Sequence, residues 1–135
     1  MDDFQLHIEL NSYALQLDGQ VVSTLAGGAA ALMAGAPAQL REIDIENAIE
    51  RSEEWLMPFS KSFQRRVLRI RDVTGRVKKT LGGRTSLDLQ ETEQAFSRAC
   101  DAVSHRRPVA REAVADLVLL RELAHHGMLV RIQLE

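Results

Sequence analysis

The chain has 135 residues, of which 45% are hydrophobic and 27% charged, and its net charge is −2. These proportions are typical of a globular domain and exclude a disordered tail. Aromatic residues make up 4%, which argues against a nucleic-acid site that stacks bases on several rings. The length predicts a single domain over residues 1–135. Because Cys100 is the lone cysteine, we expect no internal disulfide and a reducing, cytoplasmic location.

The N-terminal region has the pattern of β-structure. Apolar and polar residues alternate from Phe4 to Leu10, which predicts a half-buried strand. The dipeptide Asp18-Gly19 is typical of a hairpin turn, so a second strand and a third one are expected to follow.

The stretch from residue 20 to residue 40 carries no charge and is nominally long enough to cross a membrane. Its apolar residues are mainly alanine, and it contains several glycines and polar side chains. We therefore expect no membrane span but a short helix that ends near Gly35.

Charge is sorted along the chain. From Met1 to Glu54, ten acidic residues stand against two arginines, whereas from Lys61 to Arg84 nine basic residues stand against one acid. Two blocks of opposite charge either neutralise each other or bind outside partners.

The acidic block ends in a predicted amphipathic helix that begins near Asp44, with its glutamates on the outer face. Pro58 either kinks this helix or opens a new one. The basic block over residues 65–81 leaves two structures open. As a helix it has an apolar arc from Phe63 to Leu81 and a cationic arc opposite, and as a hairpin it turns at residues 72–75. The helix is favoured because its periodicity extends over six positions.

The C-terminal half predicts two helices and a strand. Thr85 or Ser86 is expected to cap the first helix, and the second runs from about Val109 to His126 as the central core helix. A final strand over residues 128–134 is expected to pair with the strand at residues 4–10. The fold class is therefore α+β and mainly helical, with four or five helices packed on a small sheet of N-terminal strands and one C-terminal strand.

Two sets of residues are candidates for binding. The loop before the first C-terminal helix combines glycines, an arginine and hydroxyls at a helix N-terminus, where anions are attracted. This anion-binding set is Gly82, Gly83, Arg84, Thr85 and Ser86. The second set belongs to the charge blocks and is expected to bind a partner; it is Arg65, Arg69, Arg76, Lys79, Glu46, Glu50 and Glu53.

No pattern predicts a metal ion, a cofactor or a catalytic group. His125 and His126 are neighbours on a helix and point about 100° apart, so they do not share a metal as an i, i+4 pair does. Cys100 lies on an apolar stripe, where a buried thiol is expected.

These patterns favour a non-enzymatic protein-interaction or assembly module. We expect it to form a homodimer, or to bind another protein, through the acidic and basic blocks. The alternative is an anion- or nucleic-acid-binding regulator that uses the cationic face and the loop at residues 82–86. Nucleic acid is the less favoured partner because the net charge is negative.

Overall fold

The computed structural model describes residues 3–59, 61–62 and 64–135. Its sheet has six strands in the order β3-β2-β1-β4-β6-β5. The strands are β1 (Phe4–Glu9), β2 (Ser12–Leu17), β3 (Gln20–Ala26), β4 (Val67–Asp72), β5 (Ser86–Leu87) and β6 (Arg131–Leu134). β2 runs antiparallel to its neighbours β1 and β3, whereas β1, β4 and β6 run parallel. The expected N-terminal strand and the turn at Asp18-Gly19 are confirmed.

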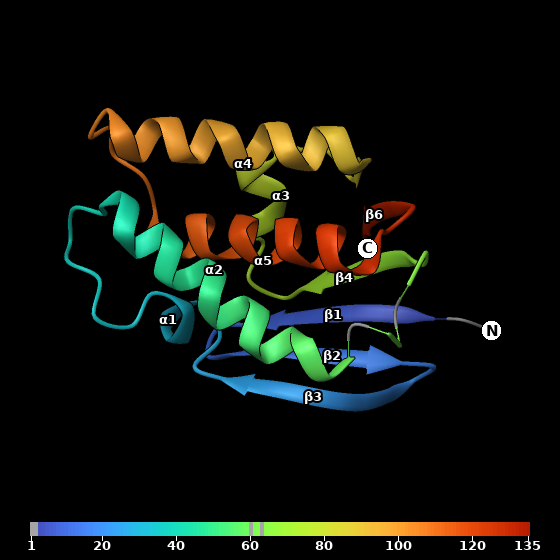
Figure 1. Cartoon of the computed structure of the whole chain (residues 1–135). Coiled ribbons are helices and arrows are strands. Elements are labelled where there is room, and N and C mark those ends of the chain that lie inside the picture. Colours follow the sequence, from blue (N-terminus) through green and yellow to red (C-terminus); the bar gives the residue numbers. More distant parts are fainter. Residues whose placement is uncertain (1–2, 60, 63) are drawn as a thin grey trace.

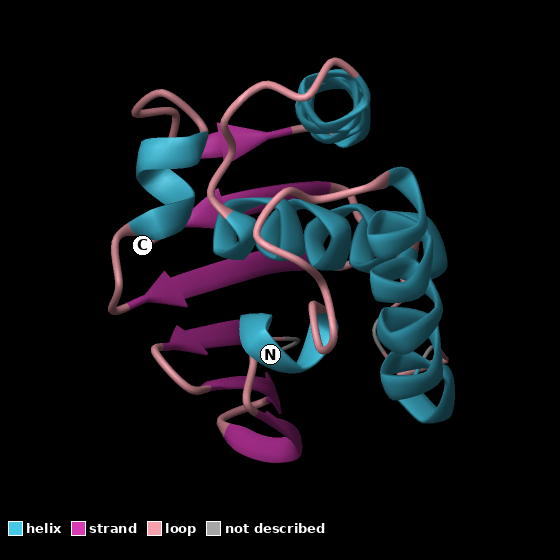
Figure 2. Cartoon of the chain, turned by 90° about the vertical axis from the view of Figure 1, so that its left-hand side faces the viewer, coloured by secondary structure: helices cyan, strands magenta, loops and turns pink. Residues whose placement is uncertain are grey.

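The helices of the described residues are α1 (Ala29–Leu32), α2 (Glu42–Leu56), α3 (Arg76–Thr80), α4 (Leu89–Ser104) and α5 (Arg111–Gly127), with a 3-10 turn, η1 (Met57–Phe59), after α2. Figure 1 shows α2 and α5 over the strands, with α4 above α5, and α4 also contacts β5. Figure 2 shows most of the helices gathered on one side of the strands. Helices packed on a mixed sheet confirm the predicted α+β class.

Helix α5 is the centre of the core, as the sequence predicts. It contacts α1, α2, α3 and α4, and Val118, Leu119 and Leu123 in its middle are completely buried. Burial on all sides explains why its apolar residues cover most of its circumference instead of one stripe.

The sheet has one apolar and one polar face. In β4, Leu68 and Ile70 are buried, whereas Arg69 and Arg71 between them are exposed. The register places Leu68 beside Phe4 of β1, so the buried residues of neighbouring strands form one continuous face. The helices cover this apolar face because packing against it removes apolar surface from water, which is favourable.

Residues 65–81 form neither the expected helix nor the expected hairpin. They contain the strand β4 and the short helix α3, which begins after Gly75. The prediction is wrong because the alternation over residues 67–71 coincides with part of a helical pattern, and pairing in the sheet selects the strand. Phe63, the first residue of the expected apolar arc, lies outside the described residues.

The final strand forms, but its expected partner is wrong. β6 pairs with β4 and β5, and β4 lies between β6 and β1. Parallel neighbours need long crossover connections. The segments that contain α1 and α2, and then α3, α4 and α5, supply these connections. None of the helices in residues 3–59, 61–62 and 64–135 combines the length and the apolar character needed to cross a bilayer.

Candidate functional site

The carboxyl ends of β1 and β4 lie side by side at one edge of the sheet. After β1 the chain continues to β2 on one side, and the strands that follow β4 lie on the other side. The loop after β4 is bound to the end of β1, since the Val73 backbone N–H donates to the Ile8 carbonyl over 3.1 Å. Ligands of open sheets bind outside the carboxyl ends of parallel strands, where the strand order reverses. A ligand site is therefore expected at this edge of the sheet.

The loop between β4 and α3 is fixed by Asp72. Its carboxylate accepts hydrogen bonds from the backbone N–H of Thr74 and of Val77, both at 2.9 Å, and from the Thr74 hydroxyl at 2.5 Å. Gly75 takes a left-handed conformation with φ of 74°, which glycine adopts at little cost. The loop thus turns directly into α3 and aims Arg76 at α5.

Arg76 is held by a buried polar network. Its guanidinium donates through Nε and Nη2 to the two carboxylate oxygens of Asp116, each over 3.0 Å. The Tyr13 hydroxyl donates to Asp116 Oδ1 over 2.5 Å, and both Tyr13 and Asp116 are buried. Burial raises the pKa of Asp116, although the hydrogen bonds from Arg76 and Tyr13 oppose that rise. Burial also raises the pKa of Tyr13 far above its ordinary value.

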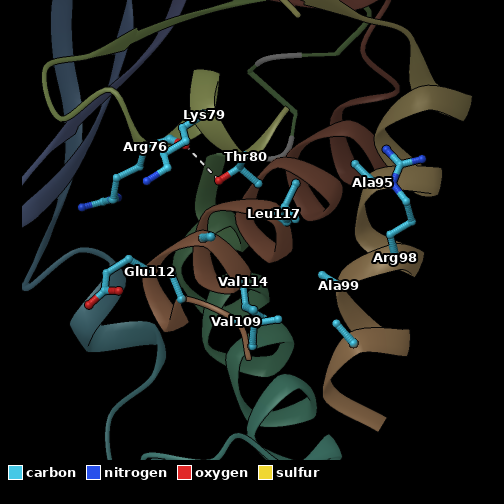
Figure 3. A pocket seen from close by; sticks show the side chains of 13 residues that line it. Arg76, Lys79, Thr80, Ala95, Arg98, Ala99, Val109, Glu112, Val114 and Leu117 are labelled. Carbon is cyan, nitrogen blue, oxygen red and sulfur yellow. Dashed lines mark hydrogen bonds between the residues drawn. The ribbon is translucent and has the colours of Figure 1, made fainter. Parts of the chain in front are cut away.

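A groove of about 490 Å³ opens beside this network, between α3, α4 and α5. Figure 3 shows Arg76 and Lys79 on one side, Arg98 on the other, and apolar side chains such as Val114 between them. Lys79 and Arg98 are exposed, and neither forms an ion pair within the described ranges. Glu112 is the single acid among the described residues that line the groove. Two exposed cations therefore flank an apolar floor, and Arg76, whose guanidinium is bound to Asp116, lies on the same side as Lys79.

The structure separates the residues that were expected to bind a partner. Arg76 and Lys79 line the groove, whereas Arg69 projects from the polar face of β4, with its Nη1 atom 3.9 Å from Asp3. Arg65 lies in the loop before β4 and is exposed.

The acidic members of that set lie on α2. Glu46 and Glu50 are exposed, and Glu53 lies beside Glu122 of α5. Within the part of the chain that the structure describes, no ion pair joins these glutamates to a cation of residues 61–84. Binding between the two blocks of separate copies, or to another protein, stays a prediction.

The loop at residues 82–86 does not directly precede the helix as expected. α4 begins after Asp88, whose carboxylate accepts the Glu91 backbone N–H over 2.7 Å. Arg84 is paired with Glu91, and the Ser86 hydroxyl accepts a hydrogen bond from Arg131 over 2.6 Å. The N-terminus of α4 is therefore capped by acidic groups, and anion binding by this loop stays a prediction.

Sequence reasoning missed Asp116, Tyr13 and Arg98. Asp116 had a recognisable signal, because an acid between the apolar residues of a central helix needs a buried partner. Tyr13 had no comparable signal. Arg98 is one of several cations along the sequence, and only the fold brings it to the groove.

No family model matches the sequence, and no curated protein matches it either. The fold is similar to solved structures of phosphatases. An exopolyphosphatase from Cytophaga hutchinsonii matches with a TM-score of 0.66 and 13% identity over 99% of this chain and 53% of its own. The type II variant of the Aquifex aeolicus Ppx/GppA phosphatase matches with a TM-score of 0.68 and 11% identity, over 99% and 53% of the two chains.

These matches correct the functional prediction. The expectation of a non-enzymatic interaction module is wrong, because the chain has a fold found in proteins described as phosphatases. At 10–13% identity the likeness shows the fold alone. The chain spans about half the length of the solved structures that it matches, with 52–54% of them covered; it has the fold of that half.

Proposed function

We propose that this chain is a polyphosphate-binding domain of a phosphohydrolase, and that the groove between α3, α4 and α5 holds the phosphate groups. The observation that carries the proposal is the pair of unpaired cations, Lys79 and Arg98, on opposite sides of that groove. The names of the similar structures, exopolyphosphatase and Ppx/GppA phosphatase, supply the class of ligand. The single cysteine supports a cytoplasmic location as part of the proposal.

The three cations differ in what they contribute. Arg76 donates through Nε and Nη2 to the carboxylate of Asp116, so it adds a fixed and partly neutralised charge. Lys79 and Arg98 are free to turn toward a ligand, and flexible cations of this kind suit a chain of phosphates. Glu112 repels phosphate from one end of the groove, which favours a ligand that lies between α3 and α4.

The test is a binding titration of the full chain with inorganic polyphosphate at several salt concentrations. We expect binding that weakens as salt rises, because contacts between cations and phosphates release counterions. Lys79→Ala and Arg98→Ala should each weaken binding about tenfold or more, since a charge-assisted hydrogen bond contributes about 1.5–3 kcal/mol.

Lys61→Ala is the matched control. Lys61 is an exposed lysine that does not line the groove, and its loss changes the net charge by the same amount as the loss of Lys79. Binding that falls equally in Lys61→Ala and Lys79→Ala would show general attraction without a site. Binding without salt dependence, or no binding by a folded wild-type chain, would also refute the proposal.

A further inference from the structure

A second cluster of polar side chains lies between α2 and α5, away from the groove. Glu122 and His126 are one turn apart on α5, and Glu53 faces them from α2. The ligand atoms of these three side chains all lie within 4.8 Å of one another. Residues four apart on a helix share a face, so α5 presents a carboxylate and an imidazole together.

Glu122 is the buried member of the cluster, with its side chain only 4% exposed. Its Oε2 atom accepts a hydrogen bond from Arg121 over 3.0 Å, and its Oε1 atom lies 3.6 Å from Nε2 of His126. The carboxylate of Glu53 lies beside that of Glu122, with their ligand atoms within 4.8 Å of each other. Arg121 therefore fixes one oxygen of Glu122, and the other oxygen is directed at the two remaining members.

We propose that Glu53, Glu122 and His126 form a binding site for a divalent transition-metal ion, with Zn²⁺ as the best fit. One imidazole nitrogen and two carboxylate oxygens are ligands that Zn²⁺ accepts, whereas Mg²⁺ and Ca²⁺ take mainly oxygen ligands. Zinc ligands lie about 2.0–2.2 Å from the ion, so modest side-chain rotations close the set. The hydrogen bond from Arg121 supplies the support that ligating carboxylates normally have.

The exposure of the cluster suits a bound ion with an open position. The side chain of His126 is 39% exposed, so an ion can enter from solvent and a water molecule can complete its coordination. The ion would join α2 to α5 through three bonds. This site is independent of the proposed phosphate groove, because none of its residues lines that groove.

The experiment titrates the full, chelator-treated chain with Zn²⁺ by calorimetry and with Co²⁺ by visible absorption. We expect one ion per chain, a rise in melting temperature with Zn²⁺, and a Co²⁺ spectrum with nitrogen and oxygen ligands. His126→Ala should weaken binding more than about tenfold. Glu122→Gln should also weaken Zn²⁺ binding. Because Glu122 is buried, this variant can fail to fold, and His126→Ala then tests the proposal by itself.

His125→Ala is the matched control, because this neighbouring histidine points elsewhere and lies 3.1 Å from Glu93. It should bind Zn²⁺ as the wild type does. Equal losses in His125→Ala and His126→Ala, unchanged binding in His126→Ala, or no binding by the wild type would overturn the proposal. Lys79→Ala should leave Zn²⁺ binding unchanged, so this proposal and the phosphate proposal fail separately.

Discussion

Replacing Arg76 with methionine should destabilise the protein more than any loss of an exposed charge. The variant leaves the Asp116 carboxylate buried, with the Tyr13 hydroxyl as its one remaining partner among those that the structure gives. Breaking a buried ion pair on one side costs about 3–5 kcal/mol. Tyr13→Phe leaves both hydrogen bonds from Arg76 in place. It should therefore lower the free energy of unfolding by only about 1.5–3 kcal/mol, the contribution of one hydrogen bond to a charged group.

The triple variant Tyr13→Phe, Arg76→Met, Asp116→Leu separates two causes of the destabilisation: the loss of the ion pair, and the burial of a charged Asp116 without its partner. It leaves no charge of the network buried, so it should be more stable than Arg76→Met alone. Urea unfolding followed by the fluorescence of Trp55 measures all three variants, and an unchanged slope with urea checks that the comparison is valid. Trp55 reports on this region because its ring stacks on Tyr13 at 6.4 Å between centroids. A loss below about 1 kcal/mol in Arg76→Met, or a triple variant less stable than that single variant, would refute the reasoning.

Three further predictions follow from packing, backbone conformation and burial. Leu117→Ala and Leu120→Ala, both in the core of α5, should each cost about 2–5 kcal/mol in urea unfolding, and losses below about 1 kcal/mol at both sites would contradict a central role for this helix. In thermal unfolding, Gly35→Ala should cost about 1–2 kcal/mol for its positive φ alone. Gly28→Ala should cost more, because the added Cβ would lie 3.0 Å from backbone atoms of β2; equal losses in the two variants would contradict this prediction. Burial raises the pKa of the Cys100 thiol, so at pH about 8 iodoacetamide should alkylate it more slowly in the folded protein than in urea, and equal rates would contradict this prediction.

The regular elements were predictable where one period dominated the sequence. The alternation from Phe4 to Leu10 and the long apolar pattern of α5 each fitted a single structure, and both predictions hold. The strand β4 was part of the less favoured hairpin alternative, because Leu68 and Ile70 satisfy a strand while neighbouring apolar residues also satisfy a helix. Pairing between β1 and β4, whose partner residues lie 64 positions apart, decides that case, and a local pattern does not contain this information.

The candidate site was less predictable than the fold. Arg76 and Lys79 were recognised as members of a cationic face, but the sequence assigned them to a partner surface. Arg98 and Asp116 reach them only through the packing of α3 and α4 on α5. Of these residues only Asp116 stands out in its local sequence, as an acid among apolar residues, so the groove exists only as a product of tertiary structure.

The place of α5 late in the sequence has a consequence for synthesis of the protein. Residues 4–26 form the first three strands, but their apolar face is covered partly by α5, which ends at Gly127. A ribosome adds about 5–20 residues per second, so roughly 5–20 seconds separate the hairpins from this helix. During that interval Phe4, Leu6 and Ile8 stay uncovered by α5, and the growing chain presents a surface that holdase chaperones recognise or that other nascent chains bind.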